Sequence, residues 1–406
     1  MPKVKLSFPI DSTFLSSVIY EGLLYLIPEY SKSFSLTEID FEDDFLSKAF
    51  ASLEDERIKE VEVRMRGKYD PEIFKKFRLE LPNEKTFYNL LKSLKENFNI
   101  IKVSREIEIF KYFSKGAVFI GLKKESKRKK LKKESKKEED EEDIITPPQI
   151  FKIDRYTGFS SLESALTSDQ LTLYLSKEVA LIALLGIYSS FVVSVRQQQQ
   201  NNYYFLFFSP DETLKRLSEG KKDLIKTLME IKNTARNALN KIISKHYSNE
   251  LLLTEVALNV EVQNLLKKEK LDKISLSLFR ISPEGQTYKI YEVVPLDFFK
   301  ETRFEAFSKY FRDQEKLIGS LRKILLPEGI LLEALSSMNK KNRYSEAENI
   351  LVAINGLYRF VVLGDVEGFY EFTRKIGEAI RKLENSDDPR ERWRAGEYRR
   401  ILTRFS

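Results

Sequence analysis

The chain has 406 residues, of which 42% are hydrophobic and 12% aromatic, so it can form two or three folded domains and is not disordered. It contains no cysteine and one histidine, which excludes disulfides, cysteine-ligated metal sites and two-histidine metal motifs. No glycine-rich phosphate-binding motif occurs either. These exclusions favour a binding protein without a cofactor over an enzyme, although 62 acidic residues leave a carboxylate-only metal site open.

The charge and hydropathy of the chain predict where it resides. Charged residues make up 32% of the chain and cysteine is absent, a composition that fits an intracellular protein of a thermophile; the net charge is +7. The longest apolar stretch, Val179–Ile187, is too short to span a bilayer, and the first residues lack the apolar region of a signal peptide. We therefore expect a cytoplasmic protein with no membrane partner.

Residues 1–122 predict an N-terminal α+β part. Lys3–Phe8 and Lys59–Met65 alternate apolar and polar residues, as half-buried strands do. Ser12–Leu26 and Glu84–Asn97 carry the spacing of helices that bury one face. Strands and helices that alternate over this length indicate a mixed α/β body.

Residues 123–148 predict a charged, flexible insertion. Lys123–Lys137 holds ten basic residues in fifteen, and Glu138–Asp143 follows with six acids in a row. Blocks of like charge repel and bury no core, so we expect an exposed loop. Its basic half could contact phosphates, or the adjacent acids could neutralise it within the chain.

Residues 149–294 predict a continuation of the α+β body with two hairpins. We expect a helix over Thr157–Ser190 capped at Ser168 or Asp169, then a first hairpin within Ser190–Phe208. Ser209–Pro210–Asp211–Glu212 is a helix-start signal. Two helices, Asp211–His246 and Asn249–Glu269, and a hairpin over Lys273–Val294 with its turn at Ser282–Gln286 complete this part.

Residues 295–406 predict a C-terminal antiparallel helical bundle. The pattern is helical throughout, with breaks near Pro327, Asn342, Gly364 and Asp388–Pro389, and the connections are short. We expect the last helix to pack through Trp393, Tyr398, Ile401 and Leu402. Six arginines of this helix spread around several faces, where Glu391 and Glu397 can pair with some of them: Arg390, Arg392, Arg394, Arg399, Arg400 and Arg404.

The first hairpin has an unusual tip. Its seven polar residues are Arg196, Gln197, Gln198, Gln199, Gln200, Asn201 and Asn202. Glutamine and asparagine pair with adenine, and arginine pairs with guanine, through base edges in a groove. The tip is therefore a candidate nucleic-acid contact, and a plain exposed polar loop is the alternative.

A second candidate lies on the helix that contains IKNTARNALNKIIS. Asn233, Arg236, Asn237, Asn240 and Lys241 fall on one face, opposite an apolar face. Asparagine is a poor helix former, so three asparagines in one stripe have no stability rationale and suit phosphate, sugar and base contacts. A tolerated surface stripe is the alternative reading.

The segment Tyr156–Glu212, which includes TGFSSLESALTSDQLTLYLSKEVALIALLGIYSSFVVSV and YYFLFFSPDE, resembles the large subunit of type I-A CRISPR interference complexes (Cascade) of thermophilic archaea. The order of parts, an α/β body followed by a helical bundle, is similar too. The resemblance lies in overall texture rather than in a diagnostic motif.

This resemblance implies a non-catalytic subunit of an antiviral defence complex. Such a subunit helps to recognise a short motif beside the DNA target and positions the target for a helicase–nuclease, while base pairing with the guide RNA reads the longer sequence. The implied partners are guide RNA, double-stranded DNA, the other subunits of the complex and the helicase–nuclease. A scaffold that contacts proteins only and a carboxylate-metal nuclease are the alternatives.

Overall fold

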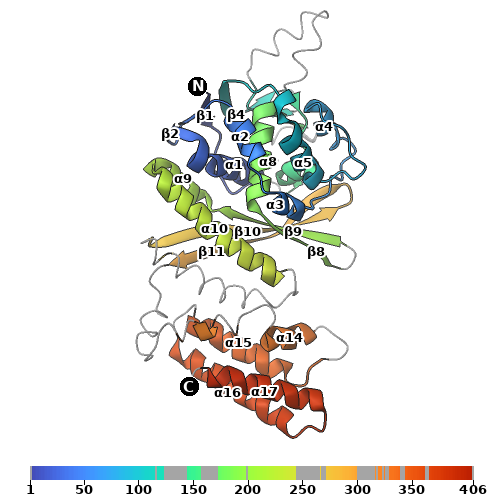
Figure 1. Ribbon diagram of the computed structural model, residues 1–406, viewed down its shortest axis with the longest axis vertical. Coiled ribbons are helices and arrows are strands. Elements are labelled where there is room, and N and C mark those ends of the chain that lie inside the picture. Colours follow the sequence, from blue (N-terminus) through green and yellow to red (C-terminus); the bar gives the residue numbers. More distant parts are fainter. Residues whose placement is uncertain are drawn as a thin grey trace, which may run out of the picture. The chain divides into compact units, whose positions relative to one another are not determined.

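The chain forms two compact units, residues 1–230 with 275–295 and residues 231–274 with 296–406. The computed structural model describes residues 2–114, 117–122, 144–156, 172–197, 200–243, 266, 271–299, 316, 319–321, 324, 329–338, 343–361 and 365–404. In the described part of the chain, two sheets with their helices belong to the first unit and a helical bundle belongs to the second (Figure 1), so the predicted α+β class is confirmed. Of the predicted insertion 123–148, residues 123–143 lie outside the described part.

The first sheet has seven strands with an internal symmetry of pairing. Their order is β2 (Ser31–Phe34), β3 (Glu38–Phe41), β1 (Lys3–Ser7), β4 (Glu106–Ser114), β5 (Ala117–Ile120), β7 (Thr172–Ser176) and β6 (Ile144–Ile145). β4 and β5 pair antiparallel at the centre, each has a parallel neighbour, β1 or β7, and each neighbour has an antiparallel one, β3 or β6. The order of parallel and antiparallel pairs is therefore the same on both sides of the centre as far as β3 and β6, and β2 has no counterpart among the described strands.

The second sheet contains both predicted hairpins. Its order is β11 (Thr287–Phe299), β10 (Lys273–Glu284), β9 (Gln200–Phe208) and β8 (Phe191–Gln197). The turn between β10 and β11 lies one residue later than expected, at Glu284–Thr287, where Gly285 has a φ of 62°. Because β9 and β10 are antiparallel, both hairpins turn at the same end of this sheet.

Two largely buried, mostly apolar helices, α1 (Phe14–Tyr30) and α8 (Lys177–Ser190), pack against each other beside the sheets (Figure 1). Each follows a strand and leads directly into a hairpin, so strand, helix and hairpin occur twice in the same order. They cross at two glycines: a Cβ on Gly22 would lie 2.0 Å from the carbonyl oxygen of Ile182, and one on Gly186 would lie 1.9 Å from that of Val18. The contact is reciprocal, since each glycine meets the residue four positions before the other.

Aromatic rings join these helices to the second sheet. The Phe14 ring of α1 makes edge-to-face contacts with Phe205 and Phe207 of β9 and with Phe279 of β10, with ring centroids 5.3 to 6.0 Å apart. At the end of α8, the buried guanidinium of Arg57 donates to the carbonyl oxygens of Tyr188 and Phe191. The base of the β8–β9 hairpin is therefore held by packing and by a buried cation.

Shorter helices complete the first unit. They are α2 (Phe45–Ala51), α3 (Asp55–Glu60), α4 (Glu72–Lys76), α5 (Phe87–Asn97), η1 (Phe98–Ile100), η2 (Gln149–Tyr156) and α9 (Pro210–Glu219). α9 begins as predicted, with Ser209 as its N-cap and Pro210 in its first turn. The expected single helix 211–246 breaks at Gly220, which has a φ of 61°, and α10 runs over Lys222–Ile243. His246 and the expected helix 249–269, apart from residue 266, lie outside the described residues.

Two predicted elements are wrong. Lys59–Met65 is not a strand: α3 ends at Glu60, and Val61 and Val63 are buried in an extended segment whose one ladder contact is the bridge Arg64–Thr86. Thr172–Ser176 is the strand β7 rather than part of a helix, and Ser176 caps α8. The expected caps Ser168 and Asp169 lie outside the described residues.

Among the described residues after β11, the second unit has four helices: α14 (Ile330–Ser337), α15 (Ala347–Val361), α16 (Val366–Glu384) and α17 (Pro389–Thr403). Their buried residues form one cluster around Phe360, Phe372 and Tyr398. Successive helices pack on one another. The break predicted near Asp388–Pro389 is present, and Asp388 caps α17 there. Trp393 does not pack in this core: its side chain is 56% exposed.

A buried carboxylate fixes the start of α1 and predicts a pH dependence. Asp154 accepts hydrogen bonds from the N–H groups of Phe14 (2.9 Å) and Leu15 (3.1 Å), and burial raises its pKa to about 6 in spite of them. The folded chain therefore binds this proton more tightly than the unfolded chain, and stability falls as the pH rises from about 4 to about 6. Lowering the pH from 7 to 5 should raise the free energy of unfolding by about 1 kcal/mol through this group. In Asp154→Asn, urea unfolding curves should no longer show this gain in the free energy of unfolding between pH 7 and pH 5. If the gain is unchanged, it comes from other groups.

Within the described part of the chain, no helix combines the length and the apolar character needed to cross a bilayer.

Candidate nucleic-acid interface

The turning end of the β8–β9 hairpin presents Arg196 and Asn201 together. The two residues face each other across the strands, so their side chains share one face of the sheet at neighbouring positions. Asn201 lies an even number of residues from Phe205 and Phe207, so its side chain is on the face of the sheet where those two rings contact Phe14. It lies beyond the rings, nearer the turn. Arg196 is exposed. A guanidinium fork and an amide thus stand side by side on a rigid base.

Asn202 is turned the other way. Successive residues of a strand point to opposite faces, and Asn202 pairs with the buried Val195. It is 8% exposed, and its Oδ1 accepts a hydrogen bond from the Ser282 hydroxyl of β10. The prediction that Asn202 belongs to the exposed tip is therefore not met, because this amide joins the two hairpins.

The remaining tip residues are described in part. β8 and β9 continue to the pair Gln197–Gln200, so the polar residues extend the strands and the connection is two residues long. Gln198 and Gln199 lie outside the described residues, as do the side chains of Gln197 and Gln200.

The asparagine stripe lies on α10 as predicted, in the part that belongs to the second unit. Asn237 is exposed, Asn233, Arg236 and Asn240 are half-buried, and Arg236 donates to the Asn237 Oδ1 at 3.3 Å. The side chain of Lys241 lies outside the described residues. Ile231, Ala235 and Leu239 on the opposite face are buried. The hairpin belongs to the first unit, so the two predicted surfaces are parts of different units.

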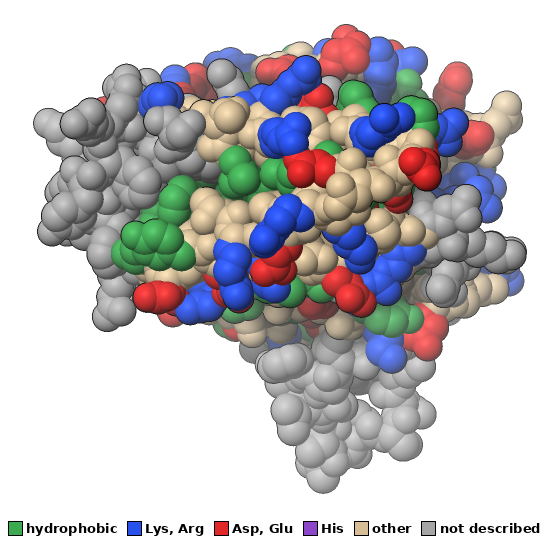
Figure 2. All heavy atoms as spheres, turned by 90° about the horizontal axis from the view of Figure 1, so that it is seen from below, with side chains coloured by type: hydrophobic (Ala, Val, Ile, Leu, Met, Phe, Trp, Pro, Cys, Tyr) green, Lys and Arg blue, Asp and Glu red, His purple; other side chains and the backbone are tan. Residues whose placement is uncertain are grey.

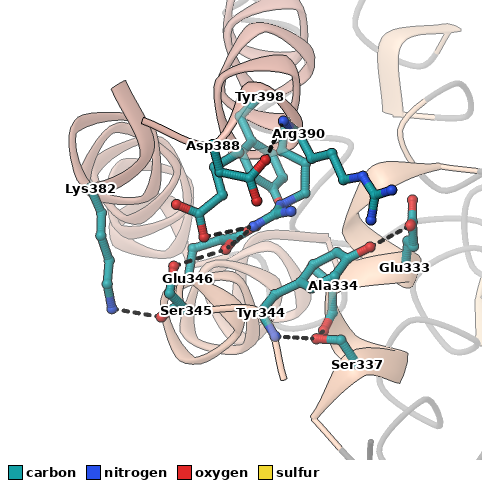
Figure 3. Close-up of polar contacts among 12 residues, drawn as sticks. Glu333, Ala334, Ser337, Tyr344, Ser345, Glu346, Lys382, Asp388, Arg390 and Tyr398 are labelled. Carbon is teal, nitrogen blue, oxygen red and sulfur yellow. Dashed lines mark hydrogen bonds and ion pairs between the residues drawn. The ribbon is translucent and has the colours of Figure 1, made fainter. Parts of the chain in front are cut away.

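A pocket that the sequence did not predict opens beside the start of α17. Its volume is about 520 Å³, and its lining includes the exposed Trp393 and two residues labelled in Figure 3, Tyr344 and Arg390. Arg390 and Trp393 are three residues apart on one helix, so both reach the same side. An exposed indole next to a guanidinium can stack on a planar base or on another planar group. The sequence feature that could have indicated this pocket is the single tryptophan, Trp393, among several arginines. From the sequence, we assigned Trp393 to the core.

The wall of this pocket is a buried ion-pair network. Glu346 is fully buried and accepts from the Arg394 Nε (2.7 Å) and from the Tyr398 hydroxyl (3.1 Å). The Arg394 guanidinium lies 4.0 Å from the centre of the Tyr344 ring, and the Tyr344 hydroxyl donates to Glu333. Burial and the negative charge of Glu346 raise the pKa of Tyr398. Arg394, expected among the solvated arginines, is a core residue.

The other C-terminal arginines do not form a continuous positively charged surface. Arg400 pairs with Glu397, as predicted, and Arg399 pairs with Glu384. In the view of Figure 2, basic and acidic side chains are interspersed. This face therefore resembles an ordinary solvated surface.

No group of three or more histidine, aspartate or glutamate side chains that could hold a metal ion occurs among the described residues.

Comparisons with known proteins identify one relative over the full length. A protein of Archaeoglobus fulgidus, described as uncharacterized, is 46% identical over 406 residues, which is 99% of this chain and 99% of that protein. No family model matches the chain, and no solved structure matches it.

Proposed function

We propose that the chain, which belongs to the same family as the Archaeoglobus fulgidus protein, is a non-catalytic nucleic-acid-binding subunit of an RNA-guided interference complex. The observation that carries the proposal is the pair of Arg196 and Asn201 at the turning end of a hairpin. Arginine and asparagine are the side chains that read guanine and adenine in a groove, and a hairpin is narrow enough to enter the major groove.

Three further features support this role. The chain carries a net charge of +7, which attracts polyanions. The α10 stripe offers amides and a guanidinium for backbone contacts, and the pocket at Trp393 offers a stacking surface. The hairpin, the α10 stripe and Trp393 each lie on a helix or strand whose other side packs in a core, and an accurately placed contact requires such support.

The division of labour in such a complex follows from this chemistry. The guide RNA reads the target by base pairing, and the subunit reads the short motif beside it and positions the duplex for a helicase–nuclease. Guide RNA, double-stranded DNA, the other subunits and the helicase–nuclease are its proposed partners, and the cytoplasm is its proposed location.

Co-purification tests the proposal directly. The tagged chain expressed in its native cell should bring down a short RNA with a constant 5′ end together with other proteins. Its DNA binding should weaken steeply with salt, because each phosphate contact releases a counterion. Proteins without RNA, and DNA binding that salt does not change, would instead support a protein-only scaffold.

The hairpin makes a sharper prediction. Arg196→Ala should reduce the preference of the assembled complex for the correct flanking motif by about tenfold, because one bidentate contact to a base contributes about 1–3 kcal/mol. Competition binding with duplexes that differ only in the flanking bases measures this preference. Lys5→Ala, which removes an exposed charge on the other sheet of the same unit, is the matched control and should leave the preference unchanged. If the two variants behave alike, the hairpin is not the reading element.

A further inference from the structure

A cavity of about 370 Å³ in the first unit collects basic side chains from three distant segments of the chain. Lys76 and Arg78 lie at the end of α4, Lys102 lies between η1 and β4, and Lys177 is the first residue of α8. These are four of the ten lining residues, and Glu178 is the one acid among them. The cavity is therefore positively charged, and its size is within the range of small-ligand sites.

The backbone of Arg78 is strained. Its φ is 57°, in the left-handed region, and the chain closes α4 there with hydrogen bonds from the Arg78 N–H to the Lys75 oxygen (2.9 Å) and from the Leu79 N–H to the Phe74 oxygen (2.8 Å). Glycine normally takes this position after a helix, because it adopts the conformation without steric cost. An arginine here therefore lowers the stability of the fold, and a role of its guanidinium in binding would explain why it occupies the position.

The acidic residue of the cavity has a structural partner. Glu178 is 8% exposed, and its Oε1 accepts a hydrogen bond from the backbone N–H of Ser104 at 2.9 Å. This bond fixes the segment that carries Lys102 to the first turn of α8, next to Lys177. The carboxylate thus positions two of the cations.

Four further lining residues are apolar. They are Phe77, Ile100, Ile101 and Val103, and Ile100 is 42% exposed. Cations beside an exposed aliphatic surface suit a ligand with an anionic group and a flat apolar body.

We propose that this cavity binds the phosphate group of a nucleotide, with Lys76, Arg78, Lys102 and Lys177 around the phosphate and Ile100 against the sugar or base. The phosphate belongs either to a free nucleoside monophosphate or to the end of a nucleic-acid strand. The site goes beyond the function proposed above, because it stands on its own geometry and uses no residue of the hairpin or of α10.

Binding measurements on the full chain test the site with two probes. Adenosine monophosphate and a ten-nucleotide DNA strand carrying a 5′-phosphate are titrated by calorimetry, with adenosine and the 5′-hydroxyl strand as controls. We expect the phosphorylated form of at least one probe to bind at least tenfold more tightly than its control. Lys102→Gln and Lys177→Gln should each remove about tenfold of that affinity, which corresponds to about 1.4 kcal/mol. Lys75→Gln is the matched control, since Lys75 is exposed next to Lys76 but does not line the cavity.

Arg78→Gly separates binding from folding. Because glycine relieves the left-handed backbone, this variant should melt at or above the temperature of the unsubstituted chain while it loses phosphate affinity. A purely structural arginine would not produce that combination. The proposal is overturned if neither phosphorylated probe binds more tightly than its control, or if Lys102→Gln and Lys177→Gln bind like Lys75→Gln. These outcomes do not depend on the hairpin, so they are distinct from failure of the proposed function.

Discussion

Gly22→Ala is expected to destabilise the first unit by about 3 kcal/mol or more, at the upper end of what overpacking costs. The added Cβ would lie 2.0 Å from the carbonyl oxygen of Ile182, and this oxygen belongs to a helix backbone that cannot rotate away as a side chain would. α1 and α8 must then move apart and lose contacts along both buried helices. Gly186→Ala meets the Val18 oxygen in the same way and should have a similar effect.

The single tryptophan makes the effect assignable to one unit. Trp393 lies in the second unit, so its fluorescence reports on that unit during urea unfolding, whereas far-ultraviolet circular dichroism reports on both. In Gly22→Ala, an early transition should appear by circular dichroism without a matching change in fluorescence. Gly396→Ala in α17 is the control: nothing lies within 4 Å of its Cβ, and we expect a gain of about 0.5–1 kcal/mol. Coincident unfolding of Gly22→Ala and the unsubstituted chain would show that the helices can separate at little cost.

Local signals in the sequence were sufficient where the structure depends on neighbouring residues. The start of α9 follows from the cap and proline at Ser209–Pro210, and the break before α17 follows from Asp388–Pro389. Both hairpins follow from bulky residues around polar turns. Alternation alone was not sufficient at Lys59–Met65, because an extended segment buries Val61 and Val63 without a strand beside it. Thr172–Ser176 is five residues long and runs straight into a helix, and so short a segment does not distinguish a buried strand from a helix.

The sites were less predictable than the fold because they join distant residues. The tip of the hairpin was visible in the sequence, but the inward turn of Asn202 depends on Ser282, which lies 80 residues away. The phosphate cavity needs α4, the segment before β4 and α8 to meet, and no spacing in the sequence encodes that meeting. Arg394 was grouped with solvated arginines because its partner, Glu346, lies 48 residues earlier.

Glu346→Ala is expected to destabilise the second unit by about 3–5 kcal/mol, because it leaves the Arg394 guanidinium buried without its carboxylate. The Tyr398 hydroxyl, on a side chain that is itself fully buried, loses its acceptor in the same substitution (Figure 3). The loss should appear in the Trp393 fluorescence transition, since Trp393 is adjacent to Arg394. The part of the circular dichroism transition that belongs to the first unit should not move.

A double substitution distinguishes the charge from the packing. Replacing a buried ion pair by apolar side chains of similar size is often neutral, whereas removing one partner is costly. Glu346→Leu with Arg394→Met should therefore recover most of the stability that Glu346→Leu alone removes, less the contribution of the Arg394 stack on Tyr344. If the double variant is no more stable than the single one, the network holds the helices by its geometry, and the start of α17, with the pocket at Trp393, depends on the full set of hydrogen bonds.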